Sequence, residues 1–179
     1  ARSVPSFASA ASPFHFSISQ KGSFFMPNLL AKSAAKSGWI FHVNAGSCNG
    51  CDIELVSILT PRYDAERLGF RLAESPRQAD IVAVSGPITM QTRDRLVRVL
   101  SQVPEPRVVL SLGSCPRSCN VFKGSYAVAG PLDRYTTVDV SVAGCPPKPE
   151  AIIAGFARAA ELLAEKQKAY RHAEKEGTK

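Results

Sequence analysis

Five cysteines are the residues of this sequence best suited to chemistry: Cys48, Cys51, Cys115, Cys119 and Cys145. Cysteine thiolates bind metals and act as nucleophiles, and in secreted proteins cysteines pair as disulfides. A disulfide framework normally uses an even number of cysteines in a shorter chain, whereas this chain has 179 residues and no clear secretory signal. The cysteine set therefore favours metal ligation.

Glycine stands just before the cysteines at three places along the chain. These motifs are Gly46-Ser47-Cys48, Gly113-Ser114-Cys115 and Gly144-Cys145. Glycine lets the backbone turn sharply and approach a bulky inorganic group, and four converging thiolates hold either Zn²⁺ or an iron-sulfur cluster. The alternative is that these cysteines are small buried apolar residues, which is common for a single cysteine.

The spacing of the cysteines bears on the choice between zinc and iron-sulfur. Structural zinc sites usually pair two Cys-x-x-Cys motifs, and only Cys48-Asn-Gly-Cys51 has that spacing. The dispersed arrangement of the others suits a cluster held at the edge of a sheet. Zinc remains an alternative at this point.

Apolar runs and helical periodicity predict the elements that position these cysteines. Strands are expected at 39–43, 70–73, 80–85, 107–112 and 138–142, and helices at 52–59, at 89–102 and from Pro149 onward. Strands that alternate with helices predict an α/β fold with a parallel sheet and helices on both faces. Ligands of such sheets gather at the carboxyl ends of the strands, where the glycine-cysteine motifs fall. The intervening segment 116–136 has no clear period and is expected to be a functional or poorly ordered loop.

The length of the chain and the change in its composition and hydrophobic pattern predict one folded domain with two flanking segments. We expect residues 1–35 to be a poorly ordered leader or extension, 36–165 to be the α/β domain and 166–179 to be a charged tail. The sequence leaves open whether residues 1–25, which precede Met26, belong to the mature protein.

The net charge of +7 does not indicate a nucleic-acid-binding protein. The first 51 residues hold four basic residues and no acid, so they contribute four of these charges, and the rest of the chain has an ordinary balance. Interleaved basic and aromatic residues, which nucleic-acid-binding surfaces use, are not found. No apolar run reaches the ~18 residues of a transmembrane helix.

A series of motifs resembles one protein family. The motifs are the segments 39–54, 60–69, 75–80, 104–106, 112–115 and 140–150. In this order they resemble the small subunit of energy-converting, membrane-bound NiFe hydrogenases and the homologous 20 kDa subunit of respiratory complex I. The resemblance extends over residues 38–163.

The resemblance implies a fold and a cofactor. The family has a flavodoxin-like three-layer fold, with a 4Fe-4S cluster that would be held here by Cys48, Cys51, Cys115 and Cys145. Complex I subunits carry adjacent cysteines at the first motif, so the Cys-x-x-Cys of this chain favours the hydrogenase branch. The sequence departs from the family after Cys115, where a Gly-Gly-containing loop is replaced by a segment with Cys119. Cys119 is then a substitute ligand, a redox-active neighbour or a buried thiol.

The implied function is electron relay. The chain would carry electrons to or from the NiFe site of a large partner subunit, coupling proton reduction or H₂ oxidation to ion translocation. Further partners would be a ferredoxin-like iron-sulfur subunit and integral-membrane subunits, at the cytoplasmic face of the cell membrane. Two alternatives are a quinone-reducing complex I subunit and a zinc-stabilised binding module.

Two further side chains have competing interpretations. Glu54 is either a proton relay toward the partner's active site or an acid that the helix dipole favours in a first helical turn. His42 lies in a predicted strand, and we expect it to be packed or hydrogen-bonded and not a metal ligand.

Overall fold

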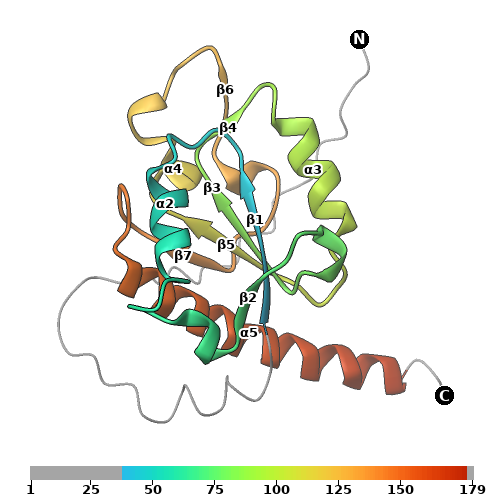
Figure 1. Ribbon diagram of the computed structural model, residues 1–179. Coiled ribbons are helices and arrows are strands. Elements are labelled where there is room, and N and C mark those ends of the chain that lie inside the picture. The colour runs from blue at the N-terminus through green and yellow to red at the C-terminus, as the bar shows by residue number, and fades with distance from the viewer. Residues whose placement is uncertain (1–37, 177–179) are drawn as a thin grey trace.

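A five-stranded parallel sheet forms the centre of the computed structural model, which describes residues 38–176 (Figure 1). Its strands are β1 (Gly38–Asn44), β2 (Phe70–Leu72), β3 (Ile81–Ser85), β5 (Val108–Leu112) and β7 (Val140–Val142). They lie in the order β2-β1-β3-β5-β7, and each neighbouring pair is parallel. This is the flavodoxin-like order, so the predicted fold class is confirmed.

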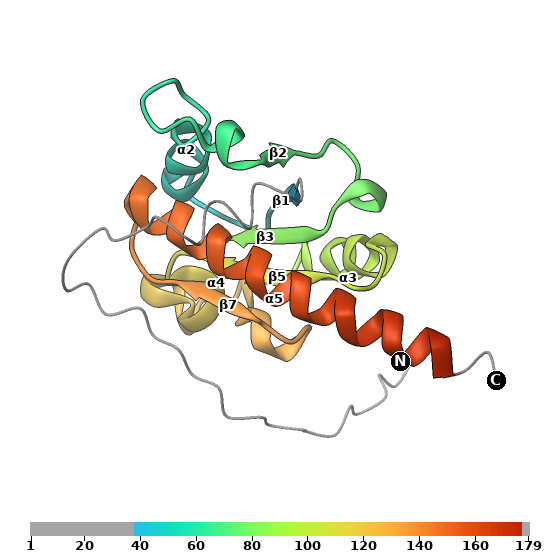
Figure 2. The same cartoon turned by 90° about the horizontal axis from the view of Figure 1, so that it is seen from below.

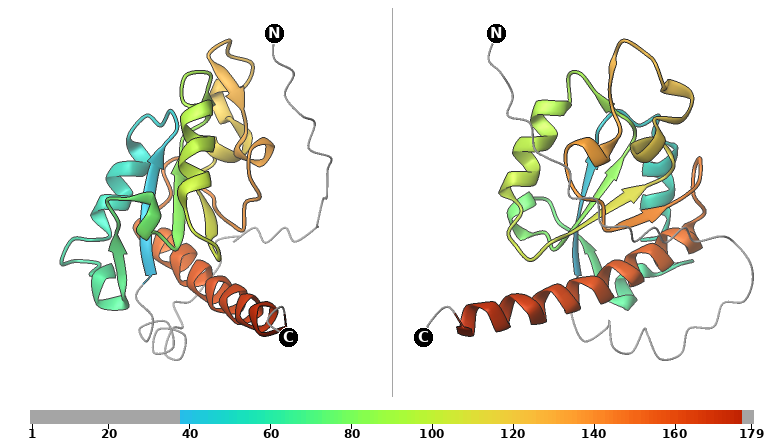
Figure 3. Two further views of the ribbon diagram at one scale, coloured as in Figure 1. Left: turned by 90° about the vertical axis from the view of Figure 1, so that its right-hand side faces the viewer. Right: turned by 180° about the vertical axis from the view of Figure 1, so that it is seen from behind.

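Helices cover both faces of the sheet. The helices are α2 (Gly50–Ser57), α3 (Arg93–Gln102), α4 (Cys115–Ser118) and α5 (Pro149–Glu176), with 3₁₀ turns at Ala65–Leu68, Pro76–Gln78, Asn120–Phe122 and Leu132–Arg134. Alternate residues of β5 serve the two faces: Val108 and Leu110 pack in the core under α2 and α5, and Val109 packs in the core under α3. Figure 3 shows α2 and α3 on opposite sides of the sheet.

The largest departures from the sequence prediction are the start of α3 and an additional pair of short strands. The helix expected from residue 89 begins at Arg93, because Thr89 belongs to the short strand β4 (Ile88–Thr89). Strand β4 pairs in antiparallel fashion with β6 (Val128–Gly130), which lies within the segment expected to be a loop. The expected leader, residues 1–35, lies outside the described residues.

Helix α5 begins at Pro149 as predicted and carries an apolar stripe, including Ile152 and Phe156, onto the sheet. It continues to Glu176 and runs past the end of the sheet (Figure 2), through the segment assigned to a charged tail.

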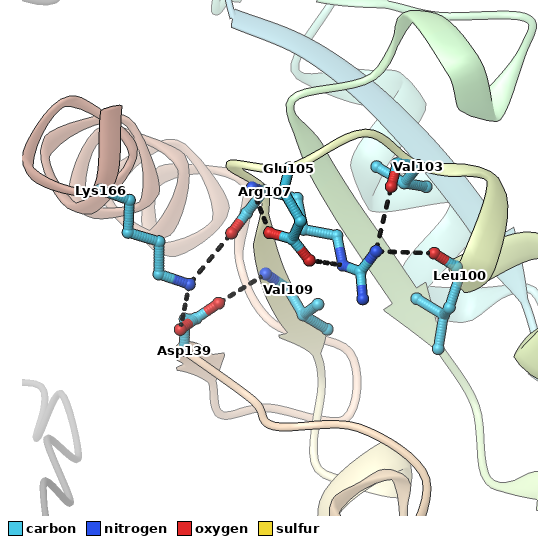
Figure 4. Close-up of polar contacts among 7 residues, drawn as sticks. All are labelled: Leu100, Val103, Glu105, Arg107, Val109, Asp139 and Lys166. Carbon is cyan, nitrogen blue, oxygen red and sulfur yellow. Dashed lines mark hydrogen bonds and ion pairs between the residues drawn. The ribbon is translucent and has the colours of Figure 1, made fainter. Parts of the chain in front are cut away.

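A polar network fixes α5 to the amino ends of β5 and β7 (Figure 4). Lys166 Nζ donates to Asp139 Oδ1 at 2.8 Å and to the Arg107 carbonyl at 3.0 Å. Asp139 Oδ2 accepts from the Val109 amide at 2.9 Å. The network thus joins three elements at the edge of the sheet opposite to the cysteine-bearing loops.

Gly155 sets how closely α5 approaches β7. A Cβ at this position would lie 2.3 Å from Val142 Cγ2, a distance at which one of the two elements must move. The side chain of Val142 is buried, so it has little room to yield.

We therefore expect Gly155→Ala to destabilise the chain by about 1–3 kcal/mol through overpacking, although alanine is the better helix former. Urea unfolding of the single variant and of Gly155→Ala/Val142→Ala measures this, and the double variant should recover part of the loss. A Gly155→Ala variant as stable as the parent would contradict the close packing.

Candidate metal centre

The loops that follow β5 and β7 are joined by backbone hydrogen bonds at the carboxyl edge of the sheet. The Gly113 amide donates to the Val142 carbonyl at 2.9 Å, and the Ser114 amide donates to the Gly144 carbonyl at 3.0 Å. The Gly144 amide donates in turn to Ser114 Oγ at 3.2 Å. Each loop carries a cysteine directly after these residues, so Cys115 and Cys145 are brought together by their own neighbours.

The loop after β1 is fixed against the end of β3. Asn44 ends β1, and its Oδ1 accepts from the amides of Gly46 and Ser47 at 3.0 and 2.8 Å, which shapes the turn before Cys48. Gly86, with φ +79, lies so close that an added Cβ would be 2.2 Å from the Ser47 nitrogen. The loop that leads to Cys48 therefore packs directly against the backbone of Gly86, which follows β3.

Gly113 brings the β5 loop against the first cysteine pair. Its φ is +86, and a Cβ here would lie 2.8 Å from Cys51 Sγ. Gly50 similarly faces the sulfur of Cys48, at 3.7 Å from its added Cβ. Glycine backbone thus lies beside two of the sulfurs.

The thiols act on one another electrostatically. Burial and then the neighbouring groups Cys115, Asp52, Cys48 and Cys145 raise the pKa of Cys51 to about 11. Burial, followed by Cys145 and Cys48, also raises the pKa of Cys115, and the Cys115 and Cys145 side chains are in hydrogen-bond contact. The four thiols therefore lie near enough to influence one another.

This site is buried on one side and open on the other. Cys51 is buried and Cys115 half-buried, whereas Cys48 and Cys145 are exposed. Within residues 38–176, no group of three or more His, Cys, Asp or Glu side chains has the arrangement that holds a single metal ion. A four-iron cluster differs from a single ion in that its own core of iron and sulfide separates the thiolates.

The other predicted residues lie around this site. Cys119 is buried, follows α4 with φ 58, and lines a pocket of about 430 Å³ with Arg117, Lys123 and Arg134. Glu54 is half-buried on α2, and its carboxylate lies 3.5 Å from Ser57 Oγ.

Sequence reasoning missed the network around Asp52. Its Oδ2 accepts from Asn44 Nδ2 at 2.6 Å, and its Oδ1 accepts from Ser85 Oγ at 2.6 Å. His42 Nε2 lies 2.9 Å from Ser85 Oγ and 3.0 Å from Asp52 Oδ1, which confirms that His42 is hydrogen-bonded. The only signal in the sequence was the i, i+2 spacing of His42 and Asn44, which places both on one face of β1.

The fold and the site together define an α/β protein with a thiol-rich centre at the carboxyl edge of a flavodoxin-like sheet. The chain belongs to the family described as NADH ubiquinone oxidoreductase, 20 Kd subunit, whose model matches residues 48–159. The resemblance found in the sequence is thereby confirmed.

Three similar proteins are subunits of oxidoreductase complexes. A probable membrane-bound hydrogenase subunit, mbhJ of Pyrococcus furiosus, is 53% identical over 135 residues, which are 75% of this chain and 81% of that protein. An NADH-quinone oxidoreductase subunit of Chlorobium limicola is 43% identical over 114 residues, which are 63% of this chain and 60% of that protein. A solved chain of the membrane-bound sulfane sulfur reductase, an archaeal respiratory membrane complex, aligns with a TM-score of 0.63 at 36% identity, and the alignment covers 76% of both chains.

We expect Gly113→Ala to reduce the metal bound per chain severely, because the new Cβ meets Cys51 Sγ. Gly124→Ala is the matched control: Gly124 has φ +85, and an added Cβ meets nothing within 4 Å. Both variants carry the same backbone strain of roughly 1–2 kcal/mol, and only the first disturbs a sulfur. Metal analysis after anaerobic purification makes the comparison, and equal metal contents in the two variants would contradict it.

Proposed function

We propose that Cys48, Cys51, Cys115 and Cys145 hold a 4Fe-4S cluster. The observation that carries the proposal is that hydrogen bonds between the loops after β5 and β7, and the close approach of Gly113 to Cys51 Sγ, bring three cysteine-bearing loops to one edge of the sheet. The donor set fits the group, because iron-sulfur clusters are held by four cysteine thiolates. Gly113 and Gly50 have no side chains that would fill the space beside the sulfurs, where the cluster would bind.

The raised pKa values of Cys51 and Cys115 have a consequence for cluster loading. Both thiols are protonated at neutral pH in the metal-free chain, and only thiolates bind metal, so loading must release protons. Burial of Cys51 then keeps water from that side of the site.

The role that follows is electron transfer within a larger complex. When bound, a 4Fe-4S cluster with four protein ligands exchanges single electrons and offers no open position to a substrate. The chain positions this relay, and the exposed side at Cys48 and Cys145 faces outward toward a partner. On α2, the helix that carries Cys51, Ile53 and Val56 are 67% and 57% exposed, which suits contact with another subunit.

The partner that we propose is a large NiFe-type subunit of a membrane-bound hydrogenase, with a ferredoxin-like subunit and integral-membrane, ion-translocating subunits completing the complex. Two features support this branch: the Cys-x-x-Cys spacing of Cys48 and Cys51, and the 53% identity to a hydrogenase subunit. None of the helices in the described part of the chain has the length and apolar character to cross a bilayer. We propose peripheral association at the cytoplasmic face, made through partners, because similar proteins are subunits of membrane-bound complexes.

A complex I-like, quinone-reducing subunit is the second candidate. The family description and the 43% identity to an NADH-quinone oxidoreductase subunit favour it. In either complex Glu54 is a proposed proton relay, since it is half-buried on the helix that carries Cys51.

Metal content and activity separate the two branches. We expect nickel to co-purify with the assembly that contains this chain, and the assembly to evolve H₂ from a low-potential reductant. Quinone-dependent NADH oxidation by an assembly without nickel would instead support the complex I branch.

The ligand assignment is tested by two cysteine variants. Cys145→Ala should abolish iron retention, because it removes one of four ligands, whereas Cys119→Ala should retain iron at the level of the parent. Iron analysis and visible absorbance of the full chain in its assembly measure both. Equal loss in the two variants would show that the ligand set is wrong.

A further inference from the structure

The Asp52 network joins the two strands at which the order of the sheet reverses. His42 and Asn44 belong to β1 and Ser85 ends β3, the neighbouring strand. Asp52 comes directly after Cys51 in the first turn of α2. Asn44 and Ser85 therefore donate to one carboxylate next to Cys51, and the His42 ring lies 3.0 Å from it.

The hydrogen bonds define where the protons of this network lie. The Ser85 hydroxyl has one hydrogen and donates it to Asp52 Oδ1 at 2.6 Å. Its oxygen must then accept from His42 Nε2 at 2.9 Å, so the imidazole carries its hydrogen on Nε2.

The donors to Asp52 are uncharged. Asn44 and Ser85 have no charge, and burial lowers the pKa of His42 despite the opposing effect of Asp52, so the imidazole is neutral near pH 7. In the described part of the chain, the three side chains that hold Asp52 stabilise its carboxylate without neutralising it. None of these three partners brings a positive charge to the carboxylate.

This carboxylate is held close to the neighbouring cysteine. Asp52 directly follows Cys51, and the hydrogen bonds from Asn44 and Ser85 fix its carboxylate at the carboxyl ends of β1 and β3. A fixed negative charge beside Cys51 disfavours an added electron on a group bound to that cysteine, because the two negative charges repel each other.

We propose that Asp52 is a potential-setting residue: its carboxylate, held in place by Asn44, Ser85 and His42, lowers the reduction potential of the cluster bound through Cys51. This inference rests on the proposed 4Fe-4S site. Reduction adds one electron to the cluster and no proton to Asp52, so the effect is purely electrostatic. Because the network holds the carboxylate in a fixed place, its effect on the reduction potential stays the same.

The test is a redox titration of the cluster, followed by EPR, in anaerobically purified assemblies that contain the full chain. Asp52→Asn removes the charge and nearly preserves the shape, and we expect a positive shift of the midpoint potential with an unchanged iron content. Asp52→Glu keeps the charge and should stay closer to the parent. Asp94→Asn removes an exposed carboxylate on α3 and is the control, for which we expect the parental potential.

Each outcome decides either this inference or the proposed function. A parent chain without iron would overturn the proposed function itself. Iron at the parental level with an unchanged potential in Asp52→Asn, or an equal shift in Asp94→Asn, would overturn only the role of Asp52. If Asp52→Asn loses iron, Asp52→Ser provides a second neutral variant, and loss of iron there too would show that Asp52 supports ligation and does not set the potential.

Discussion

The rest of this structure depends on one constraint: at the carboxyl edge of the sheet, glycine backbone must approach a cysteine sulfur closely. Gly113 can adopt φ +86 and lie against Cys51 only because it has no Cβ. The hydrogen bonds of Gly113 and Ser114 to the β7 loop then carry Cys145 to the same place. Three segments that are far apart along the chain thereby bring their cysteines to one edge of the sheet.

The two ends of the sheet have different tasks. At the amino ends of β5 and β7, Lys166 and Asp139 join α5 to the sheet through fully formed hydrogen bonds, and this end is structural. At the carboxyl end, Asp52, the residue after Cys51, contacts Asn44, Ser85 and His42, and none of these three is a Lys or Arg. The division follows from parallel topology, because all the strands deliver their following loops to one edge.

The sequence predicted the positions of the thiols better than the side chains around them. Apolar runs that end in glycine and cysteine are local patterns, so the strands ending near Val43, Leu112 and Val142, and the edge at which they meet, could be foreseen. The short pair β4 and β6 was missed because two- and three-residue strands leave no period in the sequence. Asp52 was missed for a different reason: Ser85 lies 33 residues away, and only the register of β1 against β3 brings the two together.

The most direct test of the account is to count iron and acid-labile sulfide per chain in the anaerobically purified assembly, with Mössbauer spectra that resolve the cluster bound to this chain from those of its partners. The account predicts about four iron and four sulfide ions at this chain, lost when Cys51 is replaced by alanine. About one zinc ion per chain, with no iron bound to these cysteines, would contradict it.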